Sequence, residues 1–275
     1  ERAVPPASNT READVVWLSS VVEGYTSDAI IPQASIHPFC VATLYDLTPL
    51  HAPEDMGRSL MRDWYLRRVD ALKRCDLLLA ISDWVRQDAI LRLDLPPDRI
   101  VTIGAGVDER FKPPASRASA AGAARERFGI DRPFVLYNGG FEARKNVDVL
   151  FPAFAALPVE TRRSHRLVIV GRLDEAARQR HAMRAAEVGL HADEVVFTGY
   201  VSDDDLVLLY QACALFVFPS EREGFGLPPL EAMACGAPTI ANNATSLPEV
   251  IGDASALFDA SRADAVTSAM HAVLS

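Results

Sequence analysis

The stretch ALFVFPSEREGFGLPPLEAMACGAPTI, residues 214–240, decides the fold. It opens with a nearly continuous apolar run, which is typical of a strand buried on both faces of a parallel sheet. A loop with two glycines follows. Pro228 and Pro229 then suit the first turn of a helix, where a missing N–H costs no hydrogen bond. The stretch therefore predicts a strand, a loop, a helix and the start of the next strand.

The same alternation of short strand-like runs and helical patterns extends over the whole chain. Such alternation is typical of βα units that form a parallel sheet. The predicted fold class is therefore α/β. The predicted strands are residues 14–20, 39–46, 76–82, 99–106, 134–140, 166–171, 194–199, 214–220, 238–242 and 256–259.

Residues 112–129 (KPPASRASAAGAARERFG) divide the chain of 275 residues. Their Pro, Ala, Ser and Gly content favours a linker that ends in a helix. We therefore predict two Rossmann-like domains, residues 1–111 and 112–275. Ligands of such sheets bind outside the carboxyl ends of the strands, so the site is expected in a cleft between the domains. The first domain shows four strands and no glycine-rich first loop, so we expect it to be incomplete.

Three local signals predict how helices begin. Pro152 lies inside a helical pattern and predicts a kink or a late start. Ser202 suits an N-cap, and the three aspartates after it suit a first helical turn, an interpretation favoured over a metal-binding D-x-D. Ser246 and Glu249 have the spacing of a capping box.

Composition excludes several classes of function. The net charge of −9 argues against a general nucleic-acid-binding protein. No apolar run approaches the ~18 residues that span a bilayer, and the first residues lack the apolar region of a signal peptide. The four cysteines form no CxxC pair, and we expect them to be buried. A cytoplasmic location fits these features best.

The loop after the strand at 134–140 is suited to a phosphate group. Gly139 and Gly140 let a ligand approach the backbone closely. Arg144 and Lys145 add two cations at the start of a helix, where phosphate binds readily. A tight turn with a solvated Arg-Lys pair is the alternative.

The loop of the opening stretch combines a backbone cradle with two acids. Gly224 and Gly226 leave N–H groups beside a helix start, which suits a diphosphate. Glu223 is expected to project from the loop, and Glu231 to lie about one turn inside the helix. Paired hydrogen bonds from vicinal hydroxyl groups suit a carboxylate, so two carboxylates suit a ribose and a hexose. Alternatively, Glu223 is a turn residue and Glu231 a surface residue.

Seven motifs, taken together and in this order, resemble retaining GT-B glycosyltransferases of family 4 (glycosyl transferases group 1), which include bacterial polysaccharide mannosyl- and rhamnosyltransferases. The resemblance implies a hexosyltransferase that acts without metal or cofactor and with retention of configuration. The implied partners are a nucleotide-sugar donor, with GDP-mannose expected first and UDP- or dTDP-sugars as alternatives, and a glycan or lipid-linked glycan acceptor. The motifs are YDLTPL, LLLAISDWVRQDAI, GVDERFKP, NGGFEARKN, FTGYVSDDDL, FVFPSEREGFGLPPLEAMACGAP and SLPEVIGDA.

The resemblance also implies a role for each site residue. Lys145 would neutralise the donor diphosphate, and Glu231 would hold the ribose. Glu223 would contact the donor sugar and, with Lys145, carry the catalysis. Arg172 and the Tyr200–Val201 backbone would form the wall beside the base. The implied donor-binding set is Gly139, Gly140, Arg144, Lys145, Arg172, Tyr200, Val201, Glu223, Gly224, Phe225, Gly226, Leu227 and Glu231.

Departures from the family pattern keep a second interpretation open. Tyr45 and Asp46, which we expect to contact the ligand from the first domain, stand where the family often has His-Asp. Gly140 stands where an arginine often lies. A nucleotide-sugar-binding module without transfer activity is therefore the alternative. A nicotinamide-dependent enzyme fits poorly, because GAGVDE at 104–109 lacks the rest of a G-x-G-x-x-G motif.

Residues 56–74 form a basic segment in an acidic chain. They resemble a helix that rests on an anionic membrane, which predicts peripheral contact at the inner face of the membrane. The solvated face of an ordinary helix is the alternative.

Overall fold

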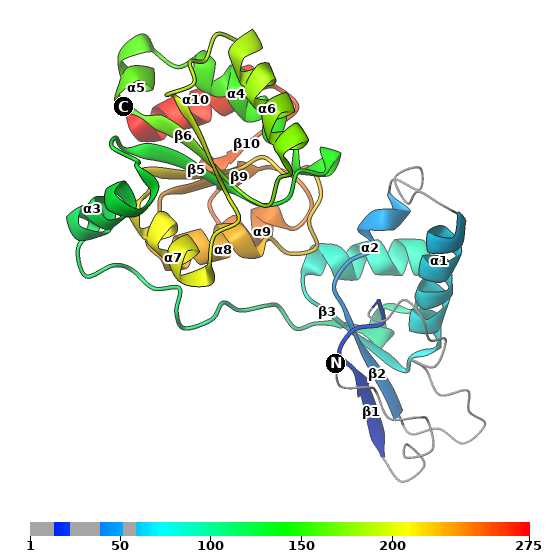
Figure 1. The fold of residues 1–275 in the computed structure, drawn as a ribbon. Coiled ribbons are helices and arrows are strands. Elements are labelled where there is room, and N and C mark those ends of the chain that lie inside the picture. The colour runs from blue at the N-terminus through cyan, green and yellow to red at the C-terminus, as the bar shows by residue number, and fades with distance from the viewer. Residues whose placement is uncertain (1–13, 23–38, 52–58) are drawn as a thin grey trace. The chain divides into compact units, whose positions relative to one another are not determined.

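The computed structural model describes residues 14–22, 39–51 and 59–275. The chain divides into two compact units, Glu1–Ala105 and Gly106–Ser275 (Figure 1). The boundary predicted after residue 111 falls in the same connecting segment. The acceptor role of the first unit and the donor role of the second stay predictions.

The first unit holds a parallel sheet with the order β1-β2-β3-β4 among the described residues. Each strand follows the previous one in sequence and in space, as expected for consecutive βα units. The strands are β1 (Val15–Leu18), β2 (Phe39–Leu44), β3 (Leu77–Ala80) and β4 (Ile100–Thr102), and the helices are α1 (Ser59–Arg74) and α2 (Asp83–Leu93), with short 3-10 turns at Thr48–Leu50 and Pro97–Arg99.

The two faces of this sheet differ in burial. One face packs against α1 and α2 through buried side chains such as Leu44 and Leu78. On the opposite face Val15, Trp17 and Phe39 are exposed, and Trp17 exposes 65% of its surface. A parallel sheet is normally covered on both faces. The part of the chain that the structure describes therefore leaves an apolar face of this sheet uncovered.

The second unit is a doubly wound sheet of six parallel strands with the order β10-β9-β8-β5-β6-β7. Its strands are β5 (Phe134–Asn138), β6 (Arg166–Val170), β7 (Val195–Gly199), β8 (Leu215–Phe218), β9 (Thr239–Asn242) and β10 (Leu257–Phe258). Its helices are α3 (Arg117–Phe128), α4 (Leu150–Ala155), α5 (Val159–Ser164), α6 (Glu175–Glu187), α7 (Asp203–Ala212), α8 (Leu227–Ala234), α9 (Leu247–Ile251) and α10 (Ala263–Leu274).

Helices cover both faces of this second sheet (Figure 1). One layer contains α4, α6 and α10, and the other contains α3, α7, α8 and α9. The central strand β8 (LFVF) is buried at all four positions. This double burial explains why the strand reads as a continuous apolar run. The predicted α/β class is confirmed, and a strand lies within each of the ten predicted segments.

Two of the three predicted helix starts are confirmed. A 3-10 turn at Val147–Val149 precedes α4, so Pro152 falls in its first turn and the helix starts late. The backbone N–H of Asp205 donates to Ser202 Oγ at 3.2 Å, as an N-cap requires. The capping box at Ser246 is wrong: its hydroxyl makes no cap bond and donates instead to carbonyl groups of a neighbouring loop.

Candidate functional site

The candidate site lies where the strand order of the second sheet reverses. Strands β5 and β8 are direct neighbours in the sheet, although the strands β6 and β7 lie between them in the sequence. Their exit loops, residues 139–146 and 219–226, leave the same edge because the strands are parallel. Ligands of doubly wound sheets bind at this kind of reversal. The fold therefore brings together two loops that are remote in sequence.

Lys145 and Glu223 form an ion pair across these two loops. Lys145 Nζ lies 2.6 Å from Glu223 Oε1, and the side chains expose only 13% and 12% of their surface. Arg144 Nη1 lies 3.7 Å from the other carboxylate oxygen. Lys145 Nζ also lies 5.6 Å from the centroid of the Phe218 ring. Two cations therefore face one carboxylate, which leaves a net positive charge for an anionic ligand.

The loop that carries Glu223 is held by the loop after β9. Thr245 Oγ1 accepts a hydrogen bond from the Glu223 N–H at 3.1 Å. Ser246 Oγ lies 3.0 Å from the Glu223 carbonyl oxygen and 2.7 Å from that of Phe225. Thr245 has a φ of 52°, which is unusual for a β-branched residue and is typical of strained positions at functional sites. The backbone around Glu223 is thus fixed from outside its own loop.

Gly226 provides the turn into α8. Its φ of 110° is accessible to glycine, and a Cβ atom there would meet Leu247 Cδ2 at 2.8 Å. Gly224 and Gly226 are both buried, Phe225 is half-buried and Leu227 exposes 43% of its surface at the start of the helix. The sequence placed these residues correctly at a helix start. Their contact with a diphosphate stays a prediction.

Glu231 lies one turn inside α8 and is bonded to a buried tyrosine. Tyr210 OH donates to Glu231 Oε2 at 3.1 Å, and Asn138 Nδ2 donates to the same hydroxyl at 3.1 Å. Burial raises the pKa of Glu231, while the hydrogen bond from Tyr210 lowers it. In the sequence, Leu206, Leu209 and Tyr210 have the spacing of one apolar helix face, which indicates Tyr210 as a core residue. The sequence gives no signal for Asn138 as part of the site.

Gly139 and Gly140 have a structural role beside the predicted one. Tyr137 OH donates to the Gly140 carbonyl at 2.6 Å. A Cβ atom on Gly139 would approach that hydroxyl at 2.7 Å. The tyrosine is buried, and this burial raises the pKa of its hydroxyl above the usual range. The glycines therefore let the loop close over Tyr137.

Arg172 and Tyr200 follow the neighbouring strands β6 and β7. The guanidinium carbon of Arg172 lies 5.1 Å from the centroid of the Tyr200 ring. Tyr200 exposes 69% of its surface, and the next residue, Val201, packs against the core. The two side chains therefore form an exposed cation–π pair at the carboxyl ends of these strands. Its contact with a base stays a prediction.

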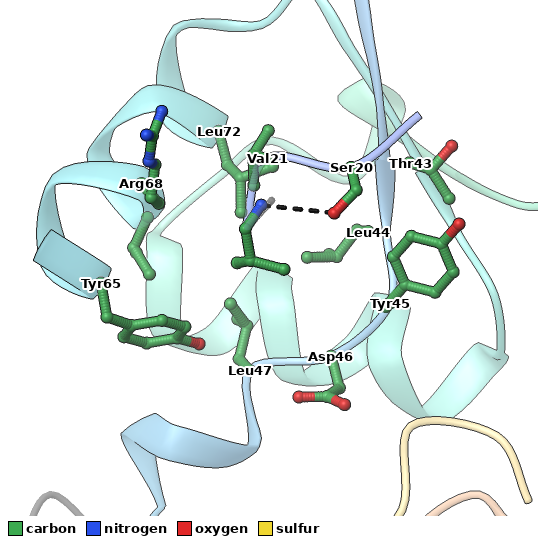
Figure 2. A pocket seen from close by; sticks show the side chains of 12 residues that line it. Ser20, Val21, Thr43, Leu44, Tyr45, Asp46, Leu47, Tyr65, Arg68 and Leu72 are labelled. Atoms are coloured by element: carbon green, nitrogen blue, oxygen red, sulfur yellow. Dashed lines mark hydrogen bonds between the residues drawn. The ribbon is translucent and has the colours of Figure 1, made fainter. Parts of the chain in front are cut away.

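Tyr45 and Asp46 lie in the first unit, at the end of β2. They line a narrow hollow in which Tyr65 of α1 and Tyr45 lie on opposite sides (Figure 2). Asp46 Oδ1 accepts a hydrogen bond from the Thr48 N–H at 2.9 Å, and Tyr45 exposes 49% of its surface. The Tyr65 hydroxyl is buried and finds no hydrogen-bond partner among the described residues. The ligand contacts of Tyr45 and Asp46 stay predictions.

The carboxylates of the D-x-D sequence are engaged by arginines. Arg110 Nη1 lies 2.9 Å from Asp203, and Arg127 Nε lies 2.5 Å from Asp205. Within residues 14–22, 39–51 and 59–275, no cluster of three or more His, Cys, Asp or Glu side chains is arranged to hold a metal ion. Asp203, Asp204 and Asp205 form the first turn of α7 after the N-cap Ser202, which supports the interpretation of D-x-D as a helix start.

The basic segment at 56–74 is described from residue 59 onward. None of the described helices is both long enough and apolar enough to cross a bilayer. Helix α1 exposes four basic and two acidic side chains, so its outer face carries a positive charge. Membrane contact stays a prediction. The exposed charged residues are Arg62, Asp63, Arg67, Asp70, Lys73 and Arg74.

Comparison with protein families and with related sequences gives a consistent result. Residues 123–275 match the family described as glycosyl transferases group 1. A serotype-specific mannosyltransferase WbdA of Escherichia coli is 36% identical over 249 residues, which are 90% of this chain and 31% of the relative. The O-antigen chain mannosyltransferase B of Escherichia coli is 35% identical over 230 residues, 82% of this chain and 59% of the relative. The chain thus spans about a third of the WbdA relative.

Solved structures share the fold. Sucrose-phosphate synthase from Thermosynechococcus elongatus matches with a TM-score of 0.70 and 28% identity, over 87% of this chain and 59% of that chain. WaaG, a glycosyltransferase involved in lipopolysaccharide biosynthesis, matches with a TM-score of 0.68 and 19% identity, over 85% and 65%. Anabaena HepE in complex with UDP and glucose matches with a TM-score of 0.69 and 21% identity, over 85% and 61%.

Proposed function

Because the chain belongs to the glycosyl transferases group 1 family, we propose that it transfers a hexosyl group from a nucleotide sugar to a glycan or lipid-linked glycan. The observation that carries this proposal is the pairing of Lys145 with Glu223 at the reversal of the second sheet. The loop of Glu223 leads into α8, and Glu231 lies one turn inside that helix. Two cations, two carboxylates and a helix start there match the charges and hydroxyl groups of a nucleoside diphosphate sugar.

Mannose is the proposed sugar and GDP-mannose the first proposed donor. The names of the related mannosyltransferases support mannose. UDP- and dTDP-sugars are the alternatives, and the HepE complex with UDP and glucose supports a UDP-sugar at a site of this fold. The donor site is proposed to lie in the second unit, because its loops carry all of the donor-binding residues inferred from the sequence.

The proposed chemistry is mainly electrostatic. Negative charge grows on the diphosphate as the bond to the sugar breaks, and Lys145, Arg144 and the N-terminus of α8 stabilise that charge without a metal ion. Glu223 stabilises the positive charge that develops on the sugar. The acceptor hydroxyl attacks the anomeric carbon from the same face as the departing diphosphate and gives its proton to that diphosphate, which retains the configuration. Double displacement with Glu223 as the nucleophile is the alternative.

A binding module without transfer activity is the second candidate function. Tyr45 favours it, because this residue stands where the family often has a histidine that orients the donor sugar. Such a chain would hold the donor in its second unit and still fail to transfer the sugar.

Donor turnover and donor affinity together separate these functions. GDP-mannose, UDP-sugars and dTDP-sugars are titrated calorimetrically, and transfer to a mannose-terminated glycan is followed for the chain and two variants. We expect Glu223→Gln to lower turnover by about 100-fold or more with little change in affinity. Glu231→Ala should weaken donor binding by roughly 10- to 100-fold, because it removes hydrogen bonds to a charged group.

The exposed residue Glu187 on α6 supplies a matched control, since Glu187→Gln should change neither quantity. Donor binding without transfer would favour the binding module. Equal and small effects of the Glu223 and Glu231 variants would contradict the assigned roles. The absence of binding for all of the nucleotide sugars would overturn both functions.

A further inference from the structure

We propose that Tyr210 is a positioning residue for the donor ribose: its hydroxyl group holds one carboxylate oxygen of Glu231, so that the other oxygen accepts hydrogen bonds from the vicinal ribose hydroxyls. The inference rests on the proposed function, which places Glu231 at the ribose. Tyr210 itself is fully buried in α7 and would not touch the donor.

The hydrogen bonds around Tyr210 have a defined direction. Asn138 Nδ2, at the carboxyl end of β5, donates to the Tyr210 hydroxyl at 3.1 Å. A phenol has one proton to give. With Asn138 as the donor on one side, that proton is directed at Glu231 Oε2, 3.1 Å away. The three residues therefore form one relay from β5 through α7 to α8.

The tyrosine ring is held rigidly, which is what a positioning role requires. Its centroid lies 5.3 Å from that of Phe216, with the rings at 80° to one another. The Phe111 ring lies 6.2 Å away on another side. The hydroxyl therefore reaches Glu231 from a fixed point in the core, and the carboxylate is oriented before a ligand arrives.

The same hydrogen bond opposes the effect of burial on the charge of Glu231. Burial raises the pKa of this carboxyl group, the Tyr210 hydroxyl lowers it, and the negative charge of Asp203 raises it. Asp203 is itself paired with Arg110, and Cys235, the residue after α8, is a further titratable group that interacts with Glu231. Loss of the Tyr210 hydroxyl should therefore raise the pKa of Glu231. On lowering the pH, the carboxylate of the variant would then be protonated at a higher pH than that of the wild type.

Tyr210→Phe is the direct test, because it removes only the hydroxyl group. The affinities for GDP, UDP and dTDP are measured between about pH 4.5 and 8, and the tightest binder is compared with its 2′,3′-dideoxy analogue. At neutral pH we expect the variant to bind the ribose nucleotide about 10-fold more weakly. The pH below which affinity falls should move upward, and the dideoxy analogue should bind both proteins equally.

Thr267→Val is the matched control. It also removes a partly buried hydroxyl group from the second unit, where Thr267 Oγ1 donates to the Ala153 carbonyl at 3.0 Å, in the helix layer that does not contain α8. This variant should leave the affinities and the pH profile unchanged. If Tyr210→Phe unfolds, Asn138→Ala removes the other end of the relay and should shift the pH profile in the same direction by a smaller amount.

The outcomes separate the inference from the proposed function. Unchanged ribose-nucleotide affinity and an unchanged pH profile in a folded Tyr210→Phe or Asn138→Ala variant would overturn the inference alone. An equal loss for the ribose nucleotide and the dideoxy analogue would also overturn it, because that loss indicates a merely structural tyrosine. A wild-type chain that binds none of the three nucleotides would overturn the proposed function, and the inference with it.

Discussion

Lys145 and Glu223 compensate each other's charge in a nearly buried place. Their side chains expose 13% and 12% of their surface, and their charged atoms lie 2.6 Å apart. Breaking such a pair costs more than forming it gains, because the remaining charge stays poorly solvated. The two partners are not equivalent, because the Arg144 guanidinium lies 3.7 Å from Glu223. Glu223 therefore keeps a cation beside it when Lys145 is removed, whereas Lys145 loses its carboxylate when Glu223 is removed.

This asymmetry predicts unequal losses of stability. Lys145→Met should cost about 1 kcal/mol, because Arg144 still faces Glu223, whereas Glu223→Gln should cost about 2 to 3 kcal/mol and leave two facing cations. The double variant should recover most of the larger loss. Urea unfolding of the four proteins measures these values. Equal costs, or strictly additive ones, would show that the pair is not coupled as described.

Single residues show clearly where sequence reasoning ends. Lys145 and Glu223 could each be identified from the loop in which they stand, but not as a pair, because 78 residues separate them. Tyr210 fits the apolar face of its helix, and no pattern separates a tyrosine that only packs from one whose hydroxyl bonds Glu231. Such partners depend on tertiary contacts that the local sequence does not encode.

At the scale of elements, the loop between β9 and α9 supports the loop that carries Glu223. The Ser246 hydroxyl donates to the carbonyls of Glu223 and Phe225 and makes no hydrogen bond that caps its own helix. The capping-box spacing was therefore misleading, because Ser246 itself has helical dihedral angles, and its side chain is directed at the carbonyls of a neighbouring loop. The start of α4 was predictable, since Pro152 restricts the backbone locally. Local chemistry therefore fixes the start of α4, whereas tertiary contacts decide how Ser246 is used at the start of α9.

Ser246→Ala tests this support. We expect a loss of about 1 to 2 kcal/mol in stability and a several-fold loss of donor affinity, because two carbonyl groups lose their donor and the Glu223 loop loosens. Ser82→Ala is the control: Ser82 is equally buried, and it caps α2 in the first unit by accepting a hydrogen bond from Val85 N at 3.0 Å.

The Ser82 variant should lose about 1 kcal/mol of stability and no donor affinity. Urea unfolding and calorimetric titration measure both quantities. A Ser246 variant that is destabilised but binds the donor as tightly as the wild type would contradict the supporting role of this loop.

At the scale of the whole molecule, the described residues of the two units differ in how they bury their sheets. The second unit has a sheet covered on both faces, a continuous core and every residue assigned to the donor. The first unit exposes Trp17 and its neighbours on one face of its sheet. The alternation of strands and helices predicted both sheets, because buried parallel strands leave a continuous apolar signature. The order of the strands was not predictable, since it depends on how helices pack after each crossover.

The central claim is that the second unit alone holds the donor diphosphate. The most direct test is the calorimetric titration of a fragment, residues 106–275, with GDP, UDP and dTDP beside the full chain. We expect the fragment to fold cooperatively and to bind one of them within about threefold of the full chain, and the Lys145→Met fragment to bind it about 10-fold more weakly. A folded fragment that binds none of the nucleotides bound by the full chain, or binds equally well without Lys145, would contradict it.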